Sequence, residues 1–412
     1  MTGVLVVDDS QFMRTVVGNA LDTAGYDVRT ADTGEAALEA VASVGGGEGN
    51  EGDAIDVITM DVEMPGMGGI EAVERIMTHD PTPILVLSAH TEAEADATLE
   101  ALERGALDVL QKPDGTGTQN LGHLTDAVVA KVDELSAAPV SALALARATA
   151  AVTATERRQV NATRSASGVS VNASASASAG STEVLESGNA GTLPARGPSA
   201  LPTMDAPTPV DGASLDHPTV VIGASTGGPK IIERLLAHLP ADLEAKVLIV
   251  QHMPADFTQR LAARLDAICA YDVFEASDGD RIAAGDVAIA RGGQHLRVVN
   301  NVNGSLRVRL DDGERVHGVR PAIDVTMETA AARVVDPLCG VVLTGMGRDG
   351  AAGIEAIADA GGYTIAQDEA TSPVFGIPQQ AIRTGRVDEV VPAPALVDRI
   401  VGAFVTDGET DE

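Results

Sequence analysis

A serine at position 225 lies in a turn of small residues, 223–229, between an apolar run and a helical pattern. The apolar run over residues 219–222 predicts a buried strand, and the spacing of apolar residues from Ile231 to Leu239 predicts a helix. Such a turn leaves the Ser225 hydroxyl clear of bulky side chains. The unpaired backbone N–H groups of a helix start point toward the same place. The stretch therefore has the chemistry of a nucleophile or of an anion-binding loop.

The anion-binding alternative would make this stretch a phosphate loop. Gly223 and Gly228 have the spacing of the two glycines in that motif. However, Pro229 occupies the position of the motif's lysine, and Lys230 comes one residue late. A helix N-terminus can bind phosphate without that lysine, so this alternative stays open beside the nucleophile that we favour.

Two residues elsewhere have the chemistry to activate Ser225. His252 follows a predicted strand over residues 245–250, and Asp349 follows another over residues 340–343. Because the carboxyl ends of parallel strands share one edge of a sheet, the three side chains can meet there. A serine nucleophile needs a base, and the base needs an orienting partner. We predict Ser225 as nucleophile, His252 as general base and Asp349 as its partner, with an oxyanion held by backbone N–H groups near Thr226 and Gly227 or near Met346.

Each of these residues also has an ordinary structural interpretation. His252 stands two residues before Pro254 and could simply begin a helix. Asp349 precedes Gly350, and this dipeptide is a strong turn signal.

A second group of polar residues lies in the first third of the chain. Asp8 and Asp9, Asp61, Ser88 and Lys112 each follow a predicted buried strand. Carboxylates at one point repel each other unless a cation joins them, and oxygen ligands with open positions suit Mg²⁺. A lysine and a hydroxyl can each hold a phosphoryl oxygen. Although any one of these residues could be a helix cap or a surface group, together they predict a site that transfers a phosphoryl group to a carboxylate.

Strands and helices alternate along both ends of the chain. This alternation predicts an α/β fold with two doubly wound, mainly parallel sheets. The expected strands of the first sheet are residues 4–7, 28–30, 55–60, 84–87 and 107–110. Those of the second are 219–222, 245–250, 272–275, 287–290, 340–343 and 363–366, with a hairpin of 294–299 and 305–310 around Asn303-Gly304.

Composition divides the chain into four segments. Residues 1–135 and 216–404 carry the core-forming patterns. Residues 136–215 are rich in alanine, serine, threonine and then proline, and they cannot bury enough surface to offset their ordering entropy. We expect a flexible linker there, with a short helical extension over residues 141–151, and an acidic tail over residues 405–412.

The net charge of −32, with four lysines in 412 residues, disfavours nucleic acid and anionic membranes as partners. No apolar run approaches the ~20 residues of a membrane span, and the acidic start is unlike a signal peptide. We therefore expect a cytoplasmic protein with no membrane insertion and with Cys269 and Cys339 as reduced thiols. The acidity also predicts adaptation to high salt, which screens self-repulsion, although an acidic protein need not require salt.

Residues 1–135 resemble the receiver domain of two-component response regulators. The resemblance is carried by Val7-Asp8-Asp9-Ser10, Met60-Asp61-Val62-Glu63-Met64-Pro65-Gly66-Met67-Gly68-Gly69, Ser88-Ala89 and Lys112-Pro113. It implies a flavodoxin-like fold with Asp61 as phosphoacceptor and with Mg²⁺ held by Asp8, Asp9 and Asp61. It also implies that Ser88 and Lys112 contact the phosphoryl group. The sequence departs from the family at Val109, where an aromatic side chain usually responds to phosphorylation.

Residues 217–404 resemble the catalytic domain of the chemotaxis protein-glutamate methylesterases. The matching segments are residues 223–229, Gln251-His252-Met253-Pro254, Arg320-Pro321-Ala322-Ile323-Asp324, residues 344–350 and Gln367-Asp368. The resemblance implies a three-layer α/β hydrolytic domain in which Ser225, His252 and Asp349 form the triad. It also implies that the Met346 backbone helps to hold the oxyanion.

Together the two resemblances imply a serine esterase that is activated by phosphorylation. It would hydrolyse glutamate γ-methyl esters on chemoreceptors, release methanol and deamidate receptor glutamines to glutamate during adaptation. A chemotaxis histidine kinase would be the phosphodonor. Mg²⁺ would serve the receiver, and the esterase reaction would need no cofactor.

Two other functions remain for comparison. A non-enzymatic adaptor, with the receiver controlling its docking, would be favoured by loss of a triad residue, and none is missing. A DNA-binding output domain is disfavoured by the acidity and by the absence of a basic recognition helix.

Overall fold

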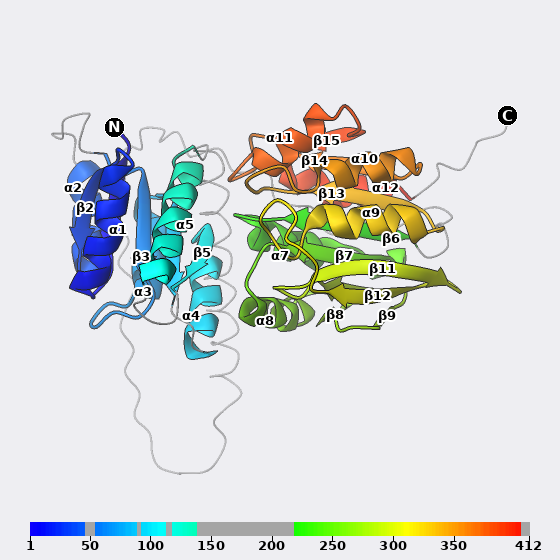
Figure 1. Ribbon diagram of the computed structural model, residues 1–412, viewed down its shortest axis with the longest axis horizontal. Coiled ribbons are helices and arrows are strands. Elements are labelled where there is room, and N and C mark those ends of the chain that lie inside the picture. The colour runs from blue at the N-terminus through cyan, green and yellow to red at the C-terminus, as the bar shows by residue number, and fades with distance from the viewer. Residues whose placement is uncertain (46–53, 89–91, 113–117, 138–217, 405–412) are drawn as a thin grey trace, which may run out of the picture.

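The computed structural model describes residues 1–45, 54–88, 92–112, 118–137 and 218–404 (Figure 1). In these segments the chain builds two parallel sheets flanked by helices and one small antiparallel sheet. The expected linker with its helical extension and the acidic tail lie outside the described residues. No helix within the described segments is long and apolar enough to cross a membrane.

The first sheet has five parallel strands in the order β2-β1-β3-β4-β5. Its order is that of flavodoxin-like doubly wound sheets, in which ligands bind at the switch between β1 and β3. The strands are β1 (Gly3–Val7), β2 (Asp27–Ala31), β3 (Val57–Asp61), β4 (Ile84–Ser88) and β5 (Asp108–Gln111). The helices are α1 (Gln11–Thr23), α2 (Gly34–Gly45), α3 (Gly69–His79), α4 (Glu92–Glu103) and α5 (Thr118–Ser136).

The second sheet has seven parallel strands in the order β15-β14-β13-β6-β7-β10-β8. They are β6 (Thr219–Ala224), β7 (Lys246–Gln251), β8 (Asp272–Glu275), β10 (Asp286–Ile289), β13 (Leu338–Val342), β14 (Tyr363–Gln367) and β15 (Glu389–Val391). The helices that follow them are α7 (Gly228–His238), α8 (Ala255–Asp266), α9 (Ile323–Arg333), α10 (Ala351–Asp359), α11 (Gly376–Arg383) and α12 (Leu396–Gly402). Figure 1 shows this part of the chain in green to red.

Both faces of the second sheet are buried. Along β6, Val220 and Ile222 belong to one hydrophobic cluster, whereas Val221 belongs to another on the opposite face. Since successive side chains of a strand point to opposite faces, a continuous aliphatic run is what a strand covered on both sides requires. This arrangement confirms the predicted three-layer α/β fold.

The predicted hairpin is present but does not join the parallel sheet. Strands β11 (His295–Val302) and β12 (Ser305–Asp311) pair antiparallel, and β9 (Arg281–Ile282) adds a third strand. Asn303 and Gly304 have φ of 51° and 71°, the left-handed geometry that a two-residue hairpin turn needs. The sheet packs on α9. The short strands β9 and β15 were not predicted because they carry too few residues for a periodic signal.

The two halves of the molecule are in contact through α4, β5 and α5 on one side and α7 and α8 on the other. Phe257 of α8 is fully buried in the hydrophobic cluster of the first sheet. Arg260 and Arg264 of α8 form ion pairs with Asp96 and Glu103 of α4. Apolar burial and paired charges therefore hold this face of the first sheet against the second half.

Candidate active site

Ser225 follows β6 directly and is held through its backbone. Its N–H donates to the carbonyl of Thr344 (3.0 Å). Its own carbonyl accepts from the Gly228 N–H (2.8 Å) and from Gln251 Nε2 (2.8 Å). The residue is buried. Three neighbouring strand ends, those of β13, β6 and β7, thus fix the position of the predicted nucleophile.

Glycines on both sides of Ser225 allow this close packing. Gly345 has φ of 153°, and a Cβ there would lie 2.6 Å from the Ser225 Cβ. A Cβ at Gly228 would lie 2.2 Å from Gln251 Oε1. Gly227 has φ of 77°, a left-handed conformation that ends the turn ahead of α7. The small residues of this stretch are therefore needed because larger side chains would clash with the residues packed around Ser225.

His252 follows β7 and pairs with Asp349. Its backbone N–H donates to the Ala224 carbonyl (3.0 Å), which joins it to the residue before Ser225. Its Nε2 lies 2.8 Å from Asp349 Oδ2. An ionised carboxylate only accepts, so the ring proton sits on Nε2 and the lone pair on Nδ1. Nδ1 is thus the nitrogen that could take a proton from Ser225, the reverse of the template in which Nδ1 faces the aspartate.

Asp349 is buried at the point where two helices begin. Its Oδ2 also accepts the N–H of Ile323 (2.7 Å), and its Oδ1 accepts the N–H of Asp324 (3.0 Å), both in the first turn of α9. Burial alone would raise the pKa of Asp349, but the hydrogen bonds from His252 and the two amides hold it below its usual value. The carboxylate is therefore kept ionised, as a partner for a histidine base must be.

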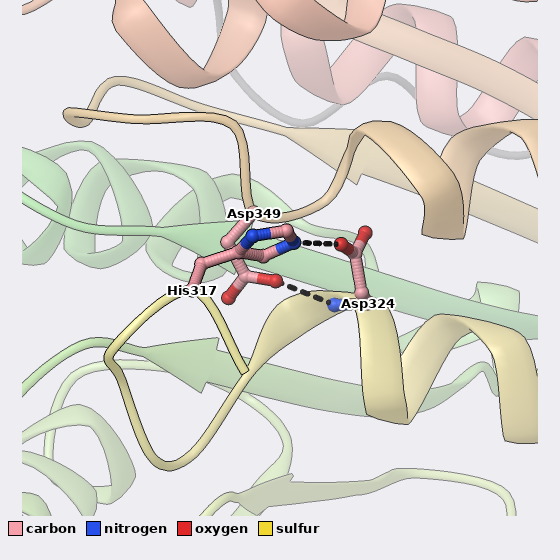
Figure 2. A group of neighbouring side chains, drawn as sticks. All are labelled: His317, Asp324 and Asp349. Carbon is pink, nitrogen blue, oxygen red and sulfur yellow. Dashed lines mark hydrogen bonds and ion pairs between the residues drawn. The ribbon is translucent and has the colours of Figure 1, made fainter. Parts of the chain in front are cut away.

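A neighbouring group joins Asp349 to Asp324 and His317 (Figure 2). One polar atom from each of the three lies within 4.8 Å of the others, a spacing that a metal ion could bridge. However, N–H donors already bind all four carboxylate oxygens, so the two carboxylates are stabilised without a cation. Sequence reasoning gave Asp324 and His317 no role. The sequence signal for Asp324 was its place in the segment Arg320-Pro321-Ala322-Ile323-Asp324, three residues after a proline and in the first turn of a helix.

One of the predicted oxyanion donors is already in use. The N–H of Gly227 donates to the carbonyl of Leu107, just before β5 of the first sheet (2.9 Å). Beside it, Thr226 Oγ1 donates to Asp108 Oδ2 (2.5 Å) and accepts from Lys131 Nζ (2.6 Å). The third candidate, Met346, lies on an exposed loop. The first half of the chain therefore covers the turn that carries Ser225.

The polar residues predicted to bind a phosphoryl group meet at the carboxyl edge of the first sheet. Oxygens of Asp8, Asp9 and Asp61 lie within 4.8 Å of one another. Lys112 Nζ lies 2.8 Å from Asp8 Oδ2 and 2.9 Å from Asp61 Oδ2. The N–H of Lys112 donates to the carbonyl of Ser88, which places the ends of β5 and β4 side by side (2.7 Å).

The electrostatics of this edge favour a bound cation. Burial raises the pKa of Asp61 to about 6. Repulsion from Asp8 also raises this pKa, whereas attraction to Lys112 lowers it. Clustered oxygens of this kind, with one exposed member in Asp9, fit a divalent cation that prefers oxygen ligands and keeps some of its water.

Two family models match the chain. The model for the response regulator receiver domain matches residues 4–119, and the model for the CheB methylesterase matches residues 220–400.

Several named proteins are similar over nearly the whole chain. The protein-glutamate methylesterase/protein-glutamine glutaminase of Halobacterium salinarum strain R1 is 48% identical over 408 residues, 98% of this chain and 99% of that protein. The protein of the same name from Natronomonas pharaonis is 43% identical over 402 residues, 97% of each. The crystal structure of the Thermotoga maritima CheB methylesterase catalytic domain is 39% identical and covers 45% of this chain and 98% of its own, with a TM-score of 0.44.

Proposed function

The chain belongs to the family of protein-glutamate methylesterases that carry a response regulator receiver domain, and we infer that it hydrolyses glutamate γ-methyl esters on chemoreceptors and releases methanol. The observation that carries this function is the hydrogen bond between His252 and Asp349 beside Ser225, at adjoining strand ends. The same chemistry on a side-chain amide deamidates glutamine to glutamate. We place the receiver at residues 1–135 and the esterase at 216–404, joined by a linker, in the cytoplasm.

The proposed mechanism follows from the orientation of His252. Ser225 Oγ attacks the ester carbonyl carbon while its proton passes to Nδ1 of His252. Asp349 stabilises the imidazolium through Nε2–H. Backbone N–H groups of Thr226, Gly227 or Met346 hold the oxyanion. The imidazolium then protonates the departing methoxide, and water releases the glutamate by the same steps in reverse.

We propose that a chemotaxis histidine kinase supplies the phosphoryl group to Asp61. Asp8, Asp9 and Asp61 would hold Mg²⁺, which neutralises charge on the phosphoryl oxygens during transfer. Lys112 and Ser88 would each hold one of those oxygens. The esterase reaction itself uses only Ser225, His252, Asp349 and backbone donors.

The contact between Gly227 and Leu107 supports inhibition by the unphosphorylated receiver. While the Leu107 carbonyl accepts from this N–H, a substrate carbonyl cannot. Strand β5 leads from Asp108 at this contact to Lys112 at the phosphoryl site. We propose that a phosphoryl group on Asp61, with a charge of roughly −1.5 to −2, displaces Lys112 and that β5 passes the change to the contact. Val109, buried on this strand, replaces the usual aromatic residue.

An Asp61→Asn variant should release methanol from methylated receptor membranes at the same rate with and without acetyl phosphate. The wild-type protein should be activated by acetyl phosphate only when Mg²⁺ is present, because crowded carboxylates repel the phosphoryl group without it. EDTA should therefore remove the activation of the wild type and leave its basal activity unchanged. Asp22→Asn, an exposed change on α1, is the matched control. Activation of the Asp61→Asn variant by acetyl phosphate would rule out this phosphoacceptor.

Without Mg²⁺, Asp61→Asn should also stabilise the protein in a pH-dependent way. Burial, with repulsion from Asp8, raises the pKa of Asp61 to about 6 in the folded protein. In an unfolded chain this pKa would be about 3.9. A raised carboxyl pKa favours folding at low pH, and this contribution is lost as pH rises through the folded pKa. The ionised carboxylate thus costs on the order of 3 kcal/mol near pH 7.5.

Urea unfolding of the full chain tests this prediction. Asp61→Asn should increase the free energy of unfolding near pH 7.5, and the gain should largely disappear by about pH 4, where the wild-type carboxyl is protonated in the folded state and about half protonated in the unfolded state. An equal gain at both pH values would show that the charge on Asp61 is not its cause.

A further inference from the structure

Two aspartates behind the active site cap each other's helices. Asp349, which precedes α10, caps the start of α9, and Asp324, in the first turn of α9, caps the start of α10. Asp349 lies just before α10 and accepts the N–H groups of Ile323 (2.7 Å) and Asp324 (3.0 Å) at the start of α9. Asp324, in the first turn of α9, accepts with Oδ1 the N–H groups of Gly350 (2.8 Å) and Gly353 (2.8 Å) at the start of α10. Any change in the position of Asp324 is therefore passed to Gly350 and to its neighbour Asp349.

Each aspartate also receives one imidazole N–H. His252 Nε2 lies 2.8 Å from Asp349 Oδ2. His317 Nε2 lies 2.8 Å from Asp324 Oδ2, as the dashed line between these two side chains in Figure 2 shows. His317 Nδ1 accepts from Arg348 Nε (3.2 Å), so the proton of a neutral His317 is on Nε2. His317 thus has the same relation to Asp324 that His252 has to Asp349.

The charge of Asp324 depends on these donors. Burial raises its pKa, and the negative charge of Asp349 raises it further, while the Gly353 and Gly350 amides and His317 act in the opposite direction. Other ionisable groups near the pair include Glu328 on α9, His295 and Arg297 on β11, and Arg348 on the loop before α10. His317 is the one side chain that donates to the Asp324 carboxylate within the described residues.

We propose that His317 and Asp324 are positioning residues of the esterase. His317 keeps Asp324 ionised and directed at the start of α10, which holds Asp349 where it accepts the Nε2–H of His252. Without His317, the Asp324 carboxylate gains a proton or turns, and His252 loses its fixed tautomer. This inference rests on the proposed function, in which His252 is the general base.

The test measures kcat and KM for methanol release from methylated receptor membranes by the full chain, with acetyl phosphate and Mg²⁺, across a range of pH. His317→Leu should lower kcat on the order of 10- to 100-fold, the cost of a misplaced catalytic group, with KM unchanged. The acid limb of the plot of kcat against pH should move to higher pH in this variant, since Asp324 then takes up a proton more readily. His317→Gln, which retains an N–H donor, should recover most of kcat and the original limb.

Two further variants separate positioning from folding. Circular dichroism and urea unfolding give the folded fraction, so that kcat is expressed per folded site, and His317→Ala replaces His317→Leu if the latter does not fold. Asp324→Asn should lower kcat as much as His317→Leu does, and adding His317→Leu to it should cost nothing more. His79→Leu, an exposed change on α3, is the matched control.

The outcomes distinguish this inference from the proposed function. If His317→Leu has the kcat and the pH dependence of the wild type, or if His317→Gln does not recover kcat, the positioning role is wrong. Either result would leave the esterase function intact. Full activity in Ser225→Ala would instead overturn the esterase mechanism itself.

Discussion

Replacing Ser225 with alanine should reduce methanol release from methylated receptor membranes on the order of 10⁶-fold, as removal of the nucleophile does in other triads. The variant keeps every backbone contact of residue 225, because those bonds use its N–H and C=O groups. It should therefore fold normally and still accept a phosphoryl group at Asp61. Catalysis would be lost because the proposed nucleophile is removed.

Further variants show whether the three residues act as a unit. Asp349→Asn should cost roughly 10⁴-fold, because an amide in place of the carboxylate stabilises the wrong tautomer of His252. Adding Ser225→Ala to it should cost little beyond Ser225→Ala alone. Ser43→Ala, on the exposed face of α2, should leave the rate unchanged. Wild-type activity in Ser225→Ala would show that Ser225 is not the nucleophile.

The sequence was sufficient to predict the strands that carry the site residues. Polar residues that directly follow buried aliphatic runs must reach the same edge of a parallel sheet, whatever the details of packing. For this reason Ser225 and His252 could be assigned to one edge of the second sheet, and Asp61 and Lys112 to one edge of the first, without knowledge of any contact.

Contacts between side chains that are distant in the sequence could not be predicted in this way. No periodic pattern links Asp324 to Gly353 or Thr226 to Asp108, since these pairs depend on how helices and halves of the molecule pack. The use of Nε2 rather than Nδ1 by His252 depends on ring orientation, which composition and spacing do not encode. The hairpin was predicted from its turn, but its separation from the main sheet depends on packing against α9.

The four lysines of this acidic chain all lie beside carboxylates. Lys112 pairs with Asp61, Lys131 with Asp108, and Lys230 with Glu233 at 3.5 Å, and the fully buried Lys246 pairs with Asp336. The four lysines of the chain thus lie in sheltered pairs, which salt screens less than exposed ones. Lys131 is the lysine that also donates to the second half of the molecule, at Thr226.

Lys131 therefore stabilises the contact that covers the nucleophile. Burial alone would lower its pKa, but the charges of Asp108 and Glu134 raise the pKa to about 12, so it stays protonated. Its Nζ lies 2.6 Å from both Asp108 Oδ2 and Thr226 Oγ1, next to Ser225. Without this cation, Asp108 and Glu134 would be two carboxylates at a contact with little water.

Lys131→Met should raise the rate of methanol release without phosphodonor about 10- to 100-fold and leave little further activation by acetyl phosphate. Removing one partner of a buried pair costs roughly 3–5 kcal/mol because the other charge is left uncompensated. When the receiver separates from the esterase, water hydrates those carboxylates, so the uncompensated charge destabilises only the docked state. Even part of this free energy shifts the equilibrium between docked and separated states enough to raise the basal rate about 10- to 100-fold. The rise in the basal rate has an upper limit, the rate of the phosphorylated wild type, because at that rate the separated state already predominates.

The matched control is Arg75→Met, which removes a cation paired with Glu71 on the exposed face of α3. It should leave the basal rate unchanged, because both side chains of that pair are about half exposed, and exposed pairs contribute at most about 1 kcal/mol. Asp61→Asn combined with Lys131→Met should remain active, since the second change acts after the phosphoryl group in the proposed sequence of events. If Lys131→Met has the basal rate of the wild type, docking at Thr226 does not inhibit the esterase, and the phosphoryl signal must act through another contact.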